Sequence, residues 1–430
     1  AVDEACAFVV QRAVQPEETF SVAFQPDGHG LSIRLRDRNL PVDPAALDGL
    51  QPDPENPATL GLVLMRAWMD EVRIFNRGRH GNEVLLVKRL KSRFDGRVRS
   101  AEPQPAACEP VEVRLVRAEE AVGVSRCLYQ AYGYSYTGAD NVYRPDWVRE
   151  MNRQGRLISA VAVTGSGEVV GHAALVRMGD RPGIYEMGQG AVVPAYRGQG
   201  LLHRLVSFLV QEAQRRGFTK LYADPVTSHR FAQKAILAQG FVECALMLGA
   251  VPPEETHPDR VSLLVAVRTL SRRQSPPLYL PEGYREVLRE TLQRAGLGRS
   301  HPEDPPPPLP RQGCLHWALQ PASQRALVQV DRVGRNTPSV LGRLLAELTR
   351  RRTALTLVDL DLSDPHGPAL IPFLRERGFF YCGLLAGLGR GDLLRMQRLQ
   401  AEVDPDLIVV ASPWGERLRE LVVGDWRSTR

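Results

Sequence analysis

A strand, a glycine-rich turn and a helix follow one another near the middle of the chain. The apolar run 184–193 predicts a buried strand, which Pro194 and a turn with Gly198 and Gly200 bring to an end. Leucine and valine at helical spacing predict a helix over 201–215. Amides at such a helix N-terminus converge on one point and favour phosphate oxygens. The turn is therefore a phosphate-binding loop or, alternatively, an ordinary strand-to-helix turn.

The residues around this turn carry a more specific pattern. The run Val192-Val193-Pro194-Ala195-Tyr196-Arg197-Gly198-Gln199-Gly200-Leu201 precedes a helix, a strand at 220–223, a second helix and Gly240-Phe241. Over 111–248 this order resembles the GNAT superfamily of acyl-CoA N-acyltransferases. The resemblance implies acetyl-CoA as cosubstrate, with its pantetheine arm along the strand and its pyrophosphate in the loop. The coenzyme residues that it implies are Ala191, Val192, Val193, Arg197, Gly198, Gln199, Gly200, Leu201, Leu202 and His229.

Glu186 lies six residues before Val192 on the predicted strand. N-acylation needs a deprotonated amine, so a carboxylate with a raised pKa near the thioester is the expected base. The resemblance places Glu186 where several GNAT members have a general-base glutamate. Strand alternation predicts that Glu186 shares a face with Gly188 and Gly190. A structural carboxylate paired with an arginine is the alternative.

The helix predicted over 227–239 differs from the family pattern at two positions. Where many relatives have a coenzyme-contacting asparagine and a general-acid tyrosine, this chain has His229 and Ile236. The resemblance therefore implies a coenzyme contact at His229, with a capping or core histidine as the alternative, and no general acid. A tyrosine-rich stretch at 132–143 takes the place of the family's acceptor-binding lid, or else packs over the sheet.

The segment 1–90 has a pattern of its own. A helix over 1–13, strands at 20–24, 31–36, 72–76 and 82–88, and a helix over 60–69 predict an α/β sandwich. With Glu4-Ala5-Cys6, Asp37-Arg38, Gly61-Leu62 and 81–90, it resembles the anti-sigma-factor serine kinases among the GHKL ATPases. The resemblance implies nucleotide contacts at Glu4, Asp37 and Gly61. It also implies that the first strand and helix of that fold precede Ala1.

Three substitutions depart from the ATPase pattern. Phe8 replaces the magnesium-binding asparagine, Asn39 replaces a glycine of the adenine-contacting turn, and Leu60 replaces a lid glycine. An aromatic ring cannot coordinate a cation. We therefore expect a degenerate domain, in which binding of ATP and magnesium is open and kinase activity is not expected.

The C-terminal region repeats the order of the central one. Strands at 315–319, 326–330, 355–359 and 380–385 alternate with helices over 340–350 and 367–377, before Gly378-Phe379. This resembles a second GNAT-type half that continues the sheet of the first, but its loop 333–338 lacks Arg-Gly-x-Gly and predicts no coenzyme. The acidic loop with Asp359, Asp361, Asp364 and His366 resembles a magnesium site; Asp364 as a helix N-cap is the simpler hypothesis.

Composition limits the class of protein. The net charge of +6 rests on dispersed arginines, because Lys88, Lys91, Lys220 and Lys234 are the only lysines, and this argues against nucleic-acid binding. No apolar run is long enough for a membrane span, so no membrane association is expected. Six scattered cysteines without metal-ligand spacing predict a reduced bacterial cytoplasm and no metal site.

The sequence thus predicts an α/β (α+β) protein with an N-terminal GHKL-type sandwich and tandem GNAT-like mixed-sheet domains. The expected domains are 1–90 (degenerate ATPase), 91–110 (linker), 111–250 (acyltransferase) and 251–430 (GNAT-like, without a coenzyme loop). The predicted function is acetyl transfer from acetyl-CoA to a small-molecule or protein amine, regulated by the fused domain or a regulatory protein partner. The alternative is a non-enzymatic acyl-CoA sensor or a partner-switching regulator.

Overall fold

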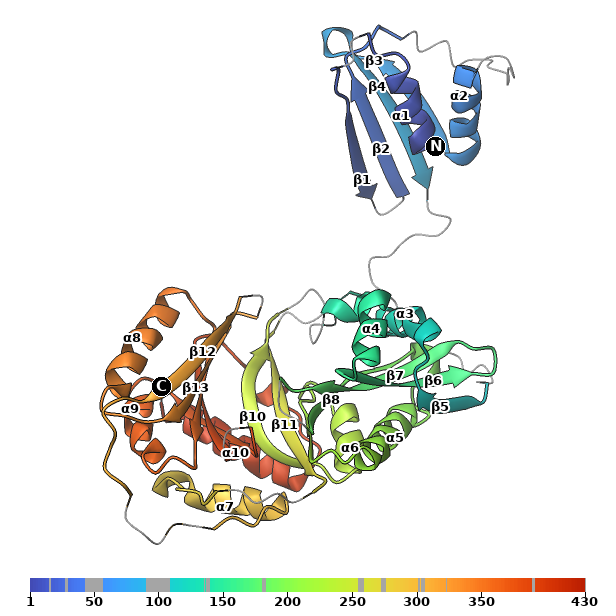
Figure 1. Cartoon of the computed structure of the whole chain (residues 1–430). Helices are drawn as coiled ribbons and strands as arrows, with labels where there is room; N and C mark the ends of the chain where they lie inside the picture. Colours follow the sequence, from blue (N-terminus) through green and yellow to red (C-terminus); the bar gives the residue numbers. More distant parts are fainter. Residues whose placement is uncertain are drawn as a thin grey trace. The chain divides into compact units, whose positions relative to one another are not determined.

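The computed structural model divides the chain into two compact units, Ala1–Glu102 and Pro103–Arg430 (Figure 1). It describes all residues except 15–16, 28–29, 43–56, 90–108, 135, 137–139, 180–182, 254–258, 272–275, 301, 303–305, 322, 389–390 and 430. The predicted linker at 91–110 falls almost wholly outside the described residues. The domain boundaries within unit 2 stay predictions.

Unit 1 is one antiparallel sheet with two helices. Its strands follow the order β1-β2-β4-β3, and α1 packs against α2 and β2. Ala5, Leu35, Met65, Val84 and Leu86 are fully or almost fully buried in its core. The elements are α1 (Val2–Val10), β1 (Ser21–Asp27), β2 (Gly30–Asp37), α2 (Pro57–Trp68), β3 (Glu71–Asn76) and β4 (Asn82–Arg89).

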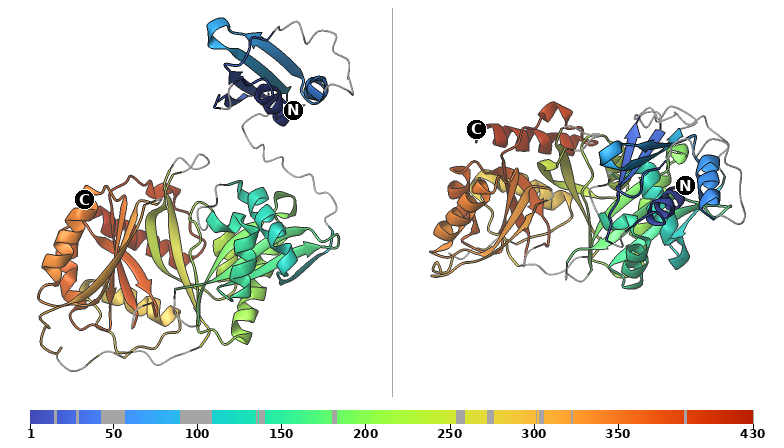
Figure 2. Two further views of the ribbon diagram at one scale, coloured as in Figure 1. Left: turned by 45° about the horizontal axis from the view of Figure 1, so that its top comes forward. Right: turned by 90° about the horizontal axis from the view of Figure 1, so that it is seen from above.

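Unit 2 begins with the elements that the central motif predicts. We call residues 111–269 the first half of unit 2. Apolar faces of α3 and α4 cover one side of its sheet, while α5 and α6 cover the other (Figures 1 and 2). The elements are β5 (Val111–Leu115), α3 (Ala121–Tyr132), α4 (Pro145–Arg153), β6 (Leu157–Thr164), β7 (Val169–Arg177), β8 (Ile184–Val192), α5 (Leu201–Arg215), β9 (Lys220–Ala223), α6 (Phe231–Leu237), β10 (Val242–Val251) and β11 (Val261–Thr269).

Residues 282–427 form the second half of unit 2. Here α7 and α10 pack against β10 and β15, so the last helix of the chain covers strands of both halves (Figure 1). The elements are α7 (Arg285–Arg294), β12 (Cys314–Gln320), β13 (Arg325–Arg332), α8 (Thr337–Arg350), β14 (Leu355–Asp361), α9 (Ile371–Arg375), β15 (Phe380–Leu385), β16 (Leu393–Leu399) and α10 (Pro413–Arg427).

The two halves share one mixed sheet of 12 strands. Its order is β12-β13-β14-β16-β15-β10-β11-β9-β8-β7-β6-β5, so the predicted continuous sheet is confirmed. The halves meet at β10 and β15, where Ala245 pairs with Gly383. A Cβ atom at Gly383 would lie 2.3 Å from the Cα atom of Ala245, so only glycine permits this approach.

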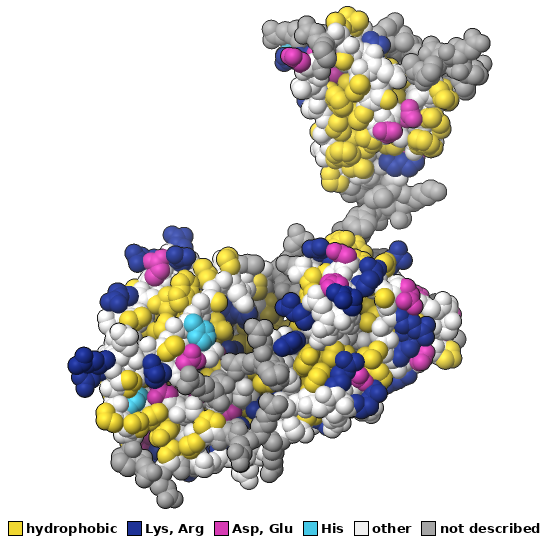
Figure 3. Space-filling view, viewed as in Figure 1, with side chains coloured by type: hydrophobic (Ala, Val, Ile, Leu, Met, Phe, Trp, Pro, Cys, Tyr) yellow, Lys and Arg dark blue, Asp and Glu magenta, His cyan; other side chains and the backbone are white. Residues whose placement is uncertain are grey.

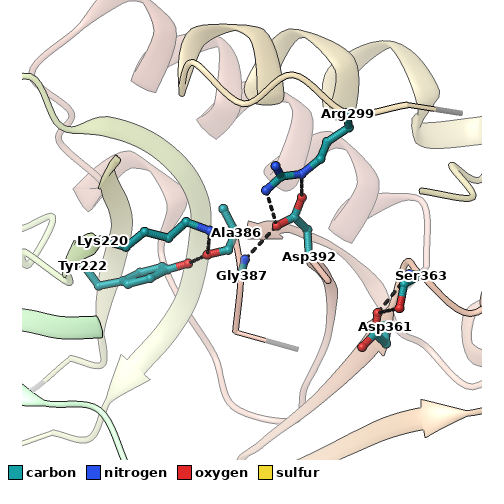
Figure 4. Close-up of polar contacts among 8 residues, drawn as sticks. All are labelled: Lys220, Tyr222, Arg299, Asp361, Ser363, Ala386, Gly387 and Asp392. Carbon is teal, nitrogen blue, oxygen red and sulfur yellow. Dashed lines mark hydrogen bonds and ion pairs between the residues drawn. The ribbon is translucent and has the colours of Figure 1, made fainter. Parts of the chain in front are cut away.

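Hydrogen bonds to Ala386 also join the two halves, and a buried ion pair of the second half lies next to them in the chain (Figure 4). Lys220 and Tyr222 of β9 both donate hydrogen bonds to the carbonyl oxygen of Ala386, just after β15. A few residues on, the carboxylate of Asp392 accepts from Gly387 N at 2.7 Å and from Arg299 Nε at 2.6 Å. Because Arg299 and Asp392 are almost completely buried, each charge depends on the other for compensation.

The helix before Gly240, α6, differs from its prediction. It was expected over 227–239, but α6 begins only at Phe231. The amide and hydroxyl of Thr227 both donate to the carbonyl of Ser262, and Val226 forms a β-bridge to Leu263. These bonds hold the chain extended alongside β11, so the helix cannot start earlier. The sequence analysis also named neither β16 nor α10.

Candidate functional site

Strands β8 and β9 run side by side for only a short distance. Their parallel pairing covers Ile184 to Glu186 on β8 and Lys220 to Tyr222 on β9. Beyond Glu186, β8 continues to Val192 in pairing with β7 alone. The backbone edge of β8 that faces away from β7 therefore loses its strand partner directly after Glu186, and such an edge can pair with an extended ligand.

A β-bulge at Gln189 lies in the middle of this free edge. Gln189 has φ of 54°, and the β7–β8 register shifts between the pairs Ala174↔Gly188 and His172↔Ala191. The side-chain Oε1 of Gln189 is buried and has no hydrogen-bond partner among the described residues.

The bulge corrects one sequence prediction. Glu186 and Gly188 share a face, because a Cβ atom at Gly188 would lie 3.3 Å from Oε1 of Glu186. Gly190 does not share it: the extra residue turns it over, and a Cβ atom there would meet Leu202 of α5. Ala191 takes the place expected for Gly190.

His172 holds the bulge from the neighbouring strand. Its Nδ1–H donates to the carbonyl of Gln189 at 3.0 Å, and its Nε2 accepts from the hydroxyl of Ser159 at 3.0 Å. Burial lowers the pKa of His172 to about 4, so the ring is neutral at physiological pH. The sequence analysis missed this residue, since nothing local marks a strand histidine as a support for the next strand.

Glu186 has the pKa expected of a base that works near neutral pH. Burial raises the pKa of Glu186 to about 7; the carboxylate of Asp224 adds to the shift and Arg325 opposes it. Burial likewise raises the pKa of Asp224, which directly follows β9. Two carboxyl groups therefore flank the point where β8 and β9 separate. Neither Asp224 nor Arg325 was predicted from the sequence.

The turn before α5 has the backbone of an anion-binding loop. Gly198 and Gly200 have φ of 79° and 70°, a conformation that favours glycine. The first amides of a helix have no acceptor within the helix, and those of α5 start at Leu201. Arg197 donates to the carbonyls of Val192 at 3.2 Å and Ala131 at 3.0 Å, so it ties the loop to β8 and α3.

The other predicted coenzyme residues fall into two groups. Val192, Val193, Gln199 and Leu202 are exposed or half-buried beside the loop, whereas Ala191 and Leu201 are buried in the core. His229 lies in the exposed turn before α6, with its ring centroid 5.3 Å from that of Phe231. Ile236 is buried, as its apolar side chain requires.

Tyrosines of the predicted lid contact the bulge directly. The hydroxyl of Tyr132 donates to the carbonyl of Gly190 at 2.6 Å, and that of Tyr136 accepts from the amide of Gln189 at 3.0 Å. Tyr143 donates to Gly133 at 2.8 Å and so braces the stretch itself. These tyrosines thus pack over the sheet at the bulge, and their part in an acceptor-binding lid stays a prediction.

In unit 1 the predicted nucleotide residues are engaged with the protein itself. Oδ1 of Asp37 accepts from the amide of Asn39 at 3.0 Å and from Nδ2 of Asn82 at 2.9 Å. Glu4 faces Gly61, where a Cβ atom would lie 2.8 Å from its Oε2. The ring of Phe8 packs against the core. Nucleotide binding therefore stays a prediction with these contacts against it.

Two family models match the chain, one over the candidate site in unit 2 and one over unit 1. Residues 124–241 match the acetyltransferase (GNAT) family. The chain contains a GNAT acetyltransferase domain. Residues 1–88 match the histidine kinase-like ATPase domain. Acetyl-CoA is the acetyl donor of the GNAT family, and the left-handed glycines, the free edge of β8 and the open helix terminus fit it.

Solved structures similar to the chain carry related names. An N-acetyltransferase from Staphylococcus aureus Mu50 is 17% identical over 38% of this chain and all of its own, with a TM-score of 0.33. YncA of Salmonella typhimurium, solved with its cofactor acetyl-CoA, is 19% identical over 39% and 98%, with a TM-score of 0.34. The ribosomal-protein-S18-alanine N-acetyltransferase of Escherichia coli is 16% identical over 40% and 100%, with a TM-score of 0.32. No curated protein matches the chain.

Two expected absences can be examined only in the part of the chain that the structure describes. Within it, no helix is long and apolar enough to cross a membrane. Nor do three or more potential metal ligands come together there. On the face seen in Figure 3, the Lys and Arg side chains of unit 2 are spread out rather than gathered into one patch.

Proposed function

We propose that the chain transfers the acetyl group of acetyl-CoA to an amine by direct attack, with Glu186 as general base. The observation that carries this proposal is the position of Glu186 at the last paired residue before β8 and β9 separate. A carboxyl group with a pKa of about 7 there can accept a proton from an alkylammonium group near neutral pH.

Acetyl-CoA supplies an acetyl group activated as a thioester. The loop from Arg197 to Leu202 binds the pyrophosphate through its amides, and the edge of Ala191 to Val193 pairs with the pantetheine arm. Glu186 takes the proton from the ammonium, directly or through water. The amine nitrogen then bonds to the acetyl carbon while the carbon–sulfur bond breaks. The nitrogen gives up its second proton to water as the amide forms. Because Ile236 has no proton to give, water protonates the departing thiolate.

The substitution Glu186→Gln tests this mechanism. For the wild-type chain kcat rises with pH through about 7, where the carboxyl group ionises, and then levels off. Above that pH the Gln variant is slower by about 100-fold or more, and its rate no longer follows this rise. Glu168→Gln, at an exposed hairpin turn of the same sheet, is the matched control with wild-type kinetics. Equal rates for both variants would refute the role of Glu186.

A second proposal concerns the role of unit 1. The internal contacts of Asp37 and the buried side of Phe8 favour a unit 1 that binds a regulatory protein rather than ATP. We propose that unit 1 regulates the transferase. Equal acetylation rates with and without magnesium-ATP would oppose nucleotide control.

The alternative to a transferase is a non-enzymatic acyl-CoA sensor. Saturable acetyl-CoA binding without transfer to any amine would favour this sensor.

We also propose that the protein works in the bacterial cytoplasm. Cys6, Cys127, Cys244, Cys314 and Cys382 are all free thiols. A reducing compartment keeps thiols in this state. Measurement of the protein's distribution between cytosolic and envelope fractions tests this location.

A further inference from the structure

One row of paired residues crosses the junction between the halves of unit 2. Directly paired residues of neighbouring strands point to the same face of a sheet. On β11, Val265 and Val267 are two residues apart and therefore also share a face. The row consists of Glu186, Tyr222, Val267, Val265, Ala245, Gly383, Arg395, Asp359 and Gln329.

This row places charged residues of the second half on the face that carries Glu186. Arg325 lies four residues before Gln329 on β13, so it points to the same face. The contact from Arg395 Nη1 to the sulfur of Met247, 3.2 Å away on β10, agrees with this arrangement.

Arg325 also lies at the end of the sheet where β8 and β9 separate. The turn before it is tied down by Arg260, whose Nη2 donates to Ser323 at 3.3 Å and whose Nε donates to Gly249 at 2.7 Å. Arg260 directly precedes β11, and β11 bridges to the segment that follows Asp224. The β12–β13 hairpin thus brings Arg325 towards Asp224.

The charges of this face differ in how they are compensated. Arg395 is fully engaged, because its Nε and Nη2 each donate to a carboxylate oxygen of Asp359 at 2.7 Å. Arg325 donates to Oε1 of Gln320 at 2.9 and 2.6 Å, but no carboxylate of the described residues lies within 4 Å of it. Burial lowers the pKa of Arg325, and the charges of Asp224 and Glu186 act in the opposite direction. The guanidinium therefore lies on the face of the sheet that carries the two carboxyl groups, without a direct contact to them.

We propose that the acceptor is a small zwitterion, an amino acid or a similar amine with a carboxylate, bound between Glu186 with Asp224 and Arg325. This proposal rests on the acetyl transfer proposed above. The ammonium lies against the two carboxyl groups, and the carboxylate meets the planar fork of the guanidinium, which suits a bidentate contact. The second half, which lacks a coenzyme loop, thereby forms the far wall of the acceptor site.

The arrangement selects against other amines. A polyamine would bring a further positive charge towards Arg325, and like charges brought together in a partly buried site repel one another. An amine without a carboxylate would leave Arg325 with its hydrogen bonds to Gln320 but without an opposite charge. Glu186, Asp224 and Arg325 are each only partly buried.

The test is a set of amino acids, each compared with its own carboxamide, with acetyl-CoA as donor and release of coenzyme A as the readout. The wild-type chain prefers the carboxylate form by about 30-fold or more in kcat/KM, the expected size of a lost charge pair. Arg325→Gln lowers this preference at least tenfold, because kcat/KM falls for the carboxylate forms. Arg332→Gln, exposed at the far end of the same strand, keeps the preference.

A binding measurement separates the possible failures. Calorimetry with free amino acids, on the chain saturated with coenzyme A, gives binding to the wild type and at least tenfold weaker binding to Arg325→Gln. Acetylation without preference for the carboxylate, or a preference that survives in Arg325→Gln, overturns the zwitterion and leaves the transferase standing. Binding of amino acids without any acetylation refutes the transferase, and absence of both binding and acetylation refutes both proposals.

Discussion

Both halves of unit 2 contain the same strand–loop–helix arrangement, but the strand in it pairs differently with its parallel neighbour. In the first half, β8 and β9 pair over 184–186 and then separate; in the second, β13 and β14 pair from Arg325 to Val330 without a gap. Only the first arrangement exposes a strand edge beside a helix terminus. A coenzyme site of this kind needs that separation as much as it needs glycines.

The loops before α5 and α8 also differ, in the contacts that their backbone amides make. Before α8, the amide of Val333 donates to Asp364 at 2.5 Å, that of Gly334 to Thr337 at 2.8 Å and that of Arg335 to Pro310 at 2.8 Å. These amides are therefore taken by acceptors of the protein itself, one of which is a carboxylate. This favours the prediction that the second half binds no coenzyme. Asp364 is not the predicted helix N-cap, since the helices that follow have His366 and Leu370 at that position.

The largest difference is expected from a glycine of each loop. A Cβ atom at Gly334 would lie 2.3 Å from the amide nitrogen of Gly313, whereas at Gly198 it meets no atom within 4 Å. Gly334→Ala therefore lowers the free energy of unfolding by about 3 kcal/mol and leaves acetyl-CoA affinity unchanged. Gly198→Ala costs about 1 kcal/mol for its left-handed backbone and weakens acetyl-CoA about tenfold. Urea unfolding and calorimetry give the two quantities, and an unchanged affinity in Gly198→Ala would remove the loop from the coenzyme site.

Much of this comparison was accessible from the sequence, because glycines, prolines and apolar spacing act locally. The strand over 220–223 and the helix over 201–215 were predicted with the bounds of β9 and α5. The helix α10 also had a local signal, Ser412 and Pro413 followed by Leu418, Val422 and Trp426, and this signal was overlooked.

The separation of β8 from β9, the bulge at Gln189 and the meeting of Asp224 with Arg325 had no such signal. Each depends on contacts between segments far apart in the chain. The position of Gly190 was mispredicted for this reason: strict alternation holds along one strand until a partner strand imposes a bulge.

A second prediction concerns His172, which supports the bulge in β8. In the second half, β13 pairs with β14 without such a bulge. Burial lowers the pKa of His172 from 6.5 to about 4, so between these pH values the unfolded chain binds more protons than the folded one. The stability of unit 2 is therefore complete above pH 6.5 and is lost as the pH falls towards 4, by about 3 kcal/mol in total. In His172→Gln this pH dependence is smaller. Urea unfolding at pH 5 and pH 7.5 measures it, and equal pH dependence in both proteins would contradict a buried neutral imidazole.

The smallest expected effect comes from Asp364. Asp364→Ala leaves the buried amide of Val333 without its acceptor and lowers the free energy of unfolding by about 2 kcal/mol. We expect acetyl-CoA affinity to stay unchanged, because this loop is predicted to bind no coenzyme. Thermal unfolding and calorimetry of the same variant check both statements. A fall in acetyl-CoA affinity would show that the second half takes part in coenzyme binding.

The most direct measurement is the stoichiometry of acetyl-CoA binding to the whole chain. Calorimetry should give one molecule per chain, with binding lost in Arg197→Glu and retained in Asp364→Ala. This result would place the only coenzyme site where β8 and β9 separate. Two molecules per chain, or binding that survives Arg197→Glu, would contradict the difference between the two halves on which the account rests.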